Sequence, residues 1–182
     1  MIELLAAFSV SAAAGIRIAL PLLVIGVLQG NNFWSQVPIL SQISPPILLS
    51  FVTTWSLVEL FASKKLLGQR VLQLVELLFS PLVGAIMGSG VANATLAPNW
   101  LIAIIGGLLA FIFQLVQIGW FFRLRGLPLW AVFLQDALCI VLVLFAFKAP
   151  WQGGLITLSM LWFAVCSAKQ WYGCYHQGKR KK

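Results

Sequence analysis

The chain has 182 residues, of which 61% are hydrophobic and only 9% are charged. Soluble globular domains carry roughly 25% charged residues, so the composition argues against a water-covered surface and favours an exterior that faces lipid. The net charge is +8, but the basic residues stand in short loops and near the C-terminal end rather than across a polar domain, which argues against a nucleic-acid partner.

Apolar stretches of about 20 residues, the length that a helix needs to cross a bilayer, follow one another along the chain. Prolines mark several boundaries, as at Pro46, Pro98 and Pro150, where a proline readily begins a helix. The predicted spans are residues 2–28, 46–62, 71–92, 100–122, 128–147 and 151–172. We therefore expect an all-α membrane bundle of six helices that forms a single domain over residues 1–172, followed by a short basic tail over 173–182.

The first and third stretches each contain a proline, Pro21 and Pro81, and we expect a kink at Pro81. The start of the chain lacks the basic residues of a cleavable signal peptide, so the first stretch is interpreted as a retained helix. The loop 29–44 carries no charge and includes Trp34. We expect this loop to lie along the outer membrane interface; a re-entrant turn is the alternative.

The distribution of basic residues predicts the orientation of the bundle in the membrane. With six spans, alternate loops share one side of the membrane, and basic residues concentrate on the cytoplasmic side. One set of loops, with the tail, contains Lys64, Lys65, Arg70, Arg123, Arg125, Lys169, Lys179, Arg180, Lys181 and Lys182, and the other contains Lys148 alone. Both termini are therefore predicted to be cytoplasmic, with the tail against anionic lipid headgroups.

Four charged residues fall well inside predicted spans, where each needs a partner or a function. Arg17 and Asp136 lie at depths that differ by roughly 5 Å at the usual helix rise. We expect these two residues to form a buried pair between the first and fifth spans. The simpler interpretation of the pair is a structural clamp, and the alternative is an ion or proton site. Glu59 and Glu76 lie nearer the cytoplasmic side, where each can reach water or pair with basic residues of the adjoining loop.

Polar residues share helix faces on two of the spans. Gln73 and Glu76 lie on one face of the third span, and Gln114 and Gln117 lie on one face of the fourth, because residues three apart come together on a helix. With Glu59, they are candidates to line a polar vestibule open to the cytoplasm. Hydrogen bonding between helices is the alternative.

Small residues recur at every fourth position on two spans. The first span carries Gly15 in such a series, and the third span carries Ser80, Gly84 and Gly88. This spacing lets helix backbones approach closely, so these residues are predicted to form packing seams.

Sequence signatures of an enzyme are missing. His176 is the only histidine, whereas a zinc site needs four ligands and a conventional triad needs a histidine at its centre. The three cysteines, Cys139, Cys166 and Cys174, are an odd number, which does not suit a disulfide framework. We expect no catalytic site, no metal and no cofactor.

Three motifs resemble those of an uncharacterised family of bacterial membrane proteins, the domain of unknown function 4126 (DUF4126). Residues 11–23 are similar to the family's small-residue opening with its leucine-proline-leucine step. Residues 59–64 resemble a Glu-x-x-Ala-Asp-Lys motif, and residues 80–85 resemble Arg-Pro-x-x-Gly-Ala.

The chain departs from the family pattern at three positions. Ser63 stands in the place of the aspartate, Ser80 in the place of the arginine, and Arg17 where many relatives carry an uncharged polar residue. The resemblance implies a multi-pass protein of a bacterial inner (plasma) membrane or of a thylakoid-type membrane. It implies no activity.

Two hypotheses about function follow from these patterns. The first is a non-enzymatic scaffold or assembly helper for a membrane complex, which the short loops and packing seams favour. The alternative is a small transporter or channel for an ion or small solute that uses Arg17 and Asp136. The expected partners are the lipid bilayer and either another membrane protein or a second copy of the chain.

Overall fold

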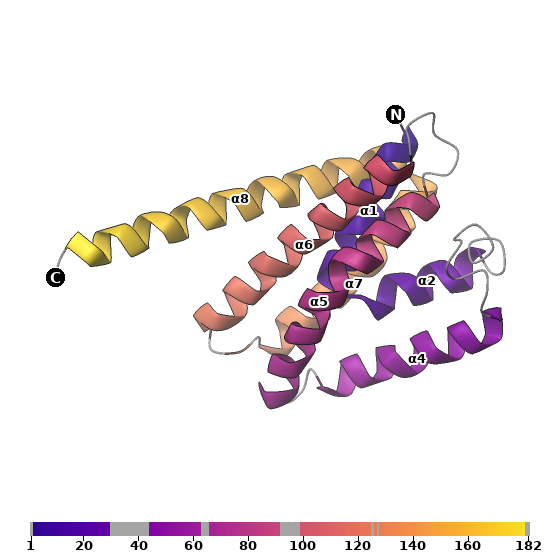
Figure 1. The fold of residues 1–182 in the computed structure, drawn as a ribbon, viewed down its shortest axis with the longest axis horizontal. Coiled ribbons are helices and arrows are strands. Elements are labelled where there is room, and N and C mark those ends of the chain that lie inside the picture. The colour runs from indigo at the N-terminus through magenta and orange to yellow at the C-terminus, as the bar shows by residue number, and fades with distance from the viewer. Residues whose placement is uncertain are drawn as a thin grey trace.

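The computed structural model describes residues 2–29, 44–62, 66–91, 99–124, 126 and 128–180, and this part of the chain is all-α. Figure 1 shows how the helices are arranged. They are α1 (Ile2–Ile16), α2 (Ala19–Gln29), α4 (Pro45–Ala62), α5 (Leu66–Val91), α6 (Asn99–Leu124), α7 (Leu129–Lys148) and α8 (Pro150–Arg180). The loop 29–44, except for its two end residues, lies outside the described residues, so its predicted position is not tested.

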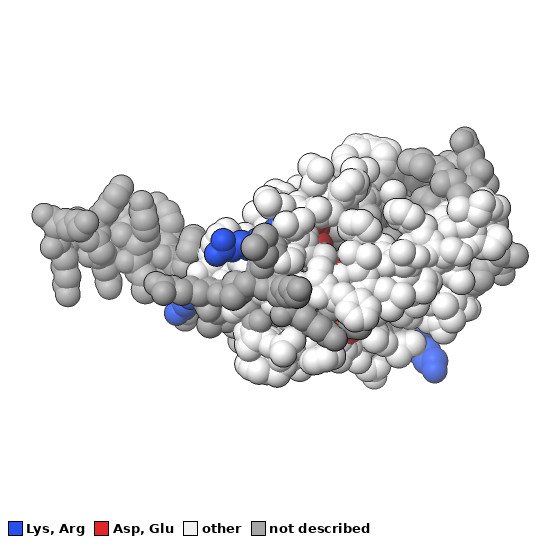
Figure 2. All heavy atoms as spheres, turned by 90° about the horizontal axis from the view of Figure 1, so that it is seen from below, with Lys and Arg blue, Asp and Glu red and all other residues white. Residues whose placement is uncertain are grey.

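Several of these helices have the character of membrane spans. Gly68–Val91, Trp100–Arg123 and Leu129–Lys148 are long and apolar enough to cross a membrane, judged by length and composition. Many large apolar side chains point outward from the helices. Figure 2 shows one face of the molecule, where uncharged residues form nearly all of the visible described surface. Such an exterior suits contact with lipid rather than with water.

The first predicted span is broken in two, so the prediction of one continuous helix was wrong. α1 ends at Ile16 and α2 begins at Ala19. The break follows from Pro21, because a proline ring has no N–H to offer and clashes with the carbonyl four residues earlier, which here is that of Arg17. The amide of Arg17 still donates to the carbonyl of Ala13 at 3.0 Å. The chain therefore leaves the helix at Arg17 and resumes it within two residues.

Two other helices are longer than predicted. α5 runs without interruption from Leu66 to Val91 with Pro81 inside it. α8 continues through Arg180, so most of the segment predicted as a tail continues the last helix. In Figure 1 this end of α8 projects well beyond the other helices.

The packing divides the bundle into two regions of different character. α1 lies at the centre and contacts α5, α6, α7 and α8. We call α1, α5 and α6 the three-helix core, because each of them packs closely against the other two. α2 and α4 lie side by side at one flank (Figure 1), and we call them the α2–α4 pair.

Glycines, which have no side chain, let the backbones of the three-helix core approach one another closely. A Cβ atom placed on Gly15 would lie 2.6 Å from the carbonyl oxygen of Ala110, and one on Gly84 would lie 2.9 Å from the carbonyl oxygen of Gly106. Real Cβ atoms do not approach carbonyl oxygens this closely, so only glycine permits these contacts.

Serine hydroxyls add hydrogen bonds to the same contacts between helices. Ser11 Oγ donates to the carbonyl of Gly84 at 3.0 Å, and Ser80 Oγ donates to the carbonyl of Ala14 at 3.4 Å. A Cβ on Gly88 would lie 2.7 Å from Ser11 Oγ. The packing seam predicted from the spacing of small residues is present in the structure.

Candidate functional site

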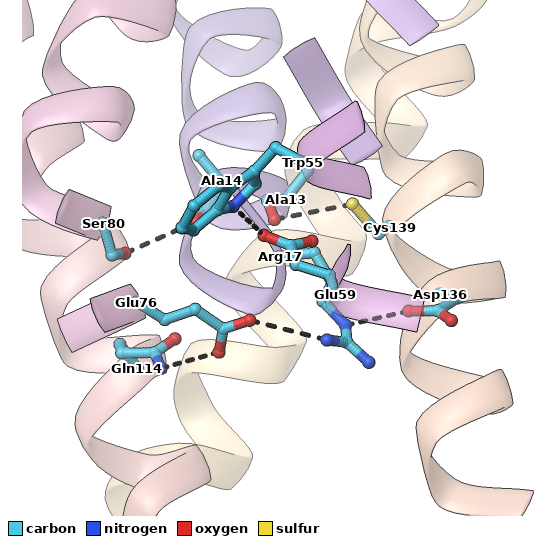
Figure 3. Close-up of polar contacts among 10 residues, drawn as sticks. All are labelled: Ala13, Ala14, Arg17, Trp55, Glu59, Glu76, Ser80, Gln114, Asp136 and Cys139. Carbon is cyan, nitrogen blue, oxygen red and sulfur yellow. Dashed lines mark hydrogen bonds and ion pairs between the residues drawn. The ribbon is translucent and has the colours of Figure 1, made fainter. Parts of the chain in front are cut away.

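The break between α1 and α2 places a buried arginine inside the bundle. Arg17 is 4% exposed, and carboxylates from three other helices surround it (Figure 3). They are Glu59 of α4, Glu76 of α5 and Asp136 of α7. We call these four residues the charge cluster. Arg17 follows the last residue of α1 and lies at the break before α2.

Arg17 makes two ion pairs. Its Nε donates to Asp136 Oδ1 at 2.9 Å, and its Nη1 lies 3.5 Å from Glu76 Oε1. The pair between Arg17 and Asp136 that was expected from their depths is therefore present. The shorter distance indicates that Asp136 is the stronger partner and Glu76 the weaker one.

Glu76 faces the interior rather than the adjoining loop. It is 2% exposed, and its Oε2 accepts a hydrogen bond from Gln114 Nε2 at 3.2 Å. Gln73 is also buried, and Gln117 is partly buried. Glu76 and Gln114 thus join α5 to α6 by a hydrogen bond between helices instead of lining an open vestibule, because both side chains are closed off from the surface.

Glu59 links the α2–α4 pair to the cluster. It is 3% exposed, so it does not reach water; the alternative, a pair with Lys64 or Lys65, lies outside the described residues. Trp55 Nε1 donates to Glu59 Oε1 at 2.8 Å, and the backbone amide of Ala19 also donates to this carboxylate. Ala19 is the first residue of α2, and the N-terminus of a helix carries a partial positive charge that attracts carboxylates. Glu59 therefore ties α4 to the start of α2 while facing Arg17.

Most of the acidic side chains of the chain gather in the cluster. Three of the four acidic residues in the chain are in the cluster, and the fourth is Glu3. Among the basic side chains that the structure describes, that of Arg17 faces them, and those of Arg70, Arg123 and Lys148 are exposed elsewhere. The ion pairs of Arg17 tie α5 and α7 to the break between α1 and α2, which partly offsets the cost of burying these charges.

The carboxylates are distributed around the guanidinium rather than gathered at one point. They approach it from three helices (Figure 3). Among the described residues, no group of three histidine, cysteine or acidic side chains is placed to hold one metal ion. Cys139, also close to the cluster, donates its thiol to the carbonyl of Ala13 at 3.5 Å.

The family model of the domain of unknown function (DUF4126) matches residues 4–170. The chain belongs to this family. All four residues of the charge cluster lie within the matched region. No curated protein and no solved structure matches the chain.

The three positions where this DUF4126 chain departs from the family motifs differ in where they lie. Ser80, at the expected arginine position, lies on α5 and bonds to the backbone of α1, so it serves packing here. Ser63 lies outside the described residues. Arg17, the third departure, is the centre of the charge cluster.

An apolar crevice in the DUF4126 fold adjoins the charge cluster. Its volume is about 280 Å³. Its lining residues come from α2, α4, α5 and the break before α2, and they are Ile18, Ala19, Leu22, Phe51, Val52, Trp55, Val75, Phe79 and Val83. Two of them, Ala19 and Trp55, are the same residues that hydrogen-bond to Glu59. The crevice and the charge cluster are therefore neighbours that meet at these two residues.

Sequence reasoning found the four charged residues but not their common location. Pro21 was the available signal for the break at Arg17, since it stands four residues later. The i, i+4 spacing of Trp55 and Glu59 was a signal for their hydrogen bond. No sequence pattern indicated that Glu59 and Glu76 face the same arginine.

Proposed function

We propose that this protein is a small membrane transporter that binds and releases protons, or another monovalent cation, at the charge cluster. The observation that carries the proposal is the buried Arg17, which lies at the interruption of the first span and is ion-paired to Asp136 of α7 and Glu76 of α5. Burying charged side chains costs free energy even when they are paired. Residues kept in a membrane interior at such a cost commonly mark ion and proton pathways.

The broken first span supports the same function. Many transporters form their ion sites where a membrane helix is interrupted, because the free helix ends supply polar backbone groups there. Here the start of α2 donates the amide of Ala19 to Glu59. The break thus adds a backbone donor to a site that contains three carboxylates.

The geometry suggests how a proton would act on the cluster. Arg17 has a short contact with Asp136 and a longer one with Glu76. Neutralisation of one carboxylate of the cluster would leave Arg17 attracted to the remaining ones. A shift of Arg17 between these partners would change the contacts of the α1–α2 break and, through Glu59, those of α4.

In this proposal the chain crosses the membrane six times and both ends are cytoplasmic. α1 and α2 together make the first crossing, and the following helices make one crossing each. The segregation of basic loop residues from Lys148 supports this orientation. The membrane is an inner membrane or a thylakoid-type membrane.

The test is proton flux in liposomes that contain the purified protein and a trapped pH-sensitive dye. A potassium diffusion potential provides the driving force. We expect flux from the native protein, and a reduction to the level of empty liposomes for Asp136→Asn and for Glu76→Gln. Glu3→Gln is the matched control, because it removes the one acid outside the cluster and should leave flux unchanged.

Two results would overturn the transporter proposal. One is flux from the native protein no greater than from empty liposomes with both the proton and sodium as the driven ion. The other is a set of folded cluster variants that conduct as well as Glu3→Gln. Folding of each variant is checked by size-exclusion chromatography in detergent before reconstitution.

A scaffold for a membrane complex is the second candidate, and the projecting end of α8 favours it. This helix extends past the bundle (Figure 1), and its Trp162 and Phe163 are exposed. Under this function the charge cluster is a clamp. Asp136→Asn would then destabilise the bundle, and exchange of the two residues, Arg17→Asp with Asp136→Arg, would partly restore stability.

A further inference from the structure

We propose that the groove between α6 and α8 holds an acyl chain of an anionic phospholipid, with the phosphate of the headgroup bound by Arg123. The groove has a volume of about 740 Å³, within the range of about 300–1,000 Å³ that is usual for small-molecule sites. Its lining residues are Phe113, Val116, Trp120, Arg123, Met160, Phe163, Ala164, Cys166 and Ser167. None of them belongs to the charge cluster, so this inference goes beyond the proposed transport function and does not depend on it.

The α6–α8 groove is polar at one end and apolar at the other. Figure 1 shows that α6 and α8 start at the same end of the bundle and diverge toward their C-terminal ends. The last lining residues of the two helices are Arg123 and Ser167, so a guanidinium and a hydroxyl lie toward the wider end. Phe113, Val116 and Met160 line the other end. This arrangement matches an amphiphile with one charged head and an apolar chain.

The length of the groove matches one leaflet of a bilayer. Arg123 stands ten positions after Phe113 on α6, which corresponds to about 15 Å at the usual helix rise. The hydrocarbon core of a bilayer is about 30 Å thick, so one leaflet contributes about half of that. Trp120 is exposed one turn before Arg123, and tryptophan rings favour the membrane interface. A chain whose headgroup lies at this interface therefore ends near mid-membrane, beside Phe113.

The charge at the polar end suits an anion. None of the four acidic side chains of the chain lines the groove, because three are in the charge cluster and Glu3 is in the first turn of α1. The ion pairs that the described residues make are both those of Arg17. The neighbouring charged residues in the sequence, Arg125 and Lys169, are also basic. A phosphate group at Arg123 therefore competes with no acidic side chain, and arginine binds phosphate through two parallel hydrogen bonds.

A lipid chain would complete the packing between the two helices. α6 and α8 both pack extensively against α1 but share only a small contact with each other. Phe163 lines the groove and is 74% exposed, so a chain in the groove covers this ring as well. A neutral lipid fills the apolar end but offers Arg123 no net negative charge, whereas an anionic lipid suits both ends.

The experiment measures phospholipid binding to the purified full-length protein in a non-ionic detergent by native mass spectrometry. Dioleoylphosphatidylglycerol is compared with dioleoylphosphatidylcholine, which has the same chains and no net charge. We expect saturable binding of phosphatidylglycerol and much weaker binding of phosphatidylcholine. Arg123→Gln should weaken the binding of phosphatidylglycerol about tenfold, equivalent to about 1.4 kcal/mol. Arg70→Gln, which removes an exposed basic side chain on α5, is the matched control and should leave binding unchanged.

A filling variant and a crosslink locate the lipid. Val116→Trp fills the α6–α8 groove and should abolish saturable binding. Val83→Trp makes the same change in the crevice between α2, α4 and α5 and should leave binding intact. Phosphatidylglycerol with a photoactivatable diazirine in one acyl chain should crosslink to residues 113–123 and 160–167 of the native protein. The crosslink keeps the test valid should Val116→Trp fail to fold.

Four results would overturn the inference. Equal binding of the two phospholipids would show that the groove takes lipid chains without regard to charge. Equal losses in Arg123→Gln and Arg70→Gln would show a general attraction of basic residues to anionic lipid. Crosslinks mainly outside the two segments would place the lipid on another surface. Absence of saturable binding would leave the groove to a partner protein. Proton flux in the liposome test bears on none of these outcomes, so each proposal can fail without the other.

Discussion

The three-helix core and the α2–α4 pair are held in the bundle by different forces. In the core, α1, α5 and α6 touch through glycines and serine hydroxyls, as at Gly15 and Ser11. The α2–α4 pair is joined to the rest through the charge cluster, through contacts of α2 with α7, and through a smaller contact of α4 with α5. Close van der Waals packing does not respond to a ligand or a proton, whereas ion pairs do.

This difference suggests that the two regions differ in rigidity. The core supplies a rigid base, because its backbones already touch and cannot approach further. In the proposed function, the α2–α4 pair changes position when a charge in the cluster is neutralised. Arg17 lies at the junction, since it follows the last turn of α1 and precedes the first turn of α2.

The largest effect is expected at this junction. Arg17→Gln leaves Glu59, Glu76 and Asp136 without their common cation, and breaking a buried ion pair in this way costs about 3–5 kcal/mol of unfolding free energy. Arg70→Gln, at an exposed position on α5, should change stability by no more than about 0.5 kcal/mol. Denaturant titration in mixed micelles measures both. Equal stabilities would show that the cluster does not join the two regions.

The second prediction compares one substitution at two positions. Gly15→Ala forces a Cβ into the carbonyl of Ala110 and should cost about 1–3 kcal/mol by overpacking. Gly119→Ala, on α6 with nothing within 4 Å of the added atom, should stabilise by up to about 1 kcal/mol through helix propensity. Thermal unfolding in detergent checks the two signs. A stabilising Gly15→Ala would mean that the core is not closely packed.

The smallest effect on total stability is expected in the α2–α4 pair. Trp55→Phe removes the indole donor to Glu59 and should cost about 1 kcal/mol, because the amide of Ala19 still supports that carboxylate. The loss should be local, so hydrogen exchange by mass spectrometry should become faster in α4 but not in α1. Trp162→Phe, an exposed change on α8, is the control. Equal acceleration in both helices would contradict a separate flank.

The sequence alone determined the class of the protein and one long-range contact. Its composition required an apolar exterior, and the helical repeat of Ser80, Gly84 and Gly88 identified the packing face of α5. The depths of Arg17 and Asp136 predicted their ion pair, because helix rise converts residue number into depth. These predictions need only the sequence of a single helix, or the depth of two residues along the membrane normal.

Only the tertiary structure decided how the helices face one another. Glu59 and Glu76 were expected to reach water or to pair with basic residues of the adjoining loop, yet both are buried and face the same guanidinium. The rotation of a helix about its axis depends on all its neighbours, and a few polar residues on one face do not show which neighbouring helix that face contacts. Likewise, Pro21 accounts for a break in the helix, but only the structure shows that carboxylates of α4, α5 and α7 surround the arginine at this break.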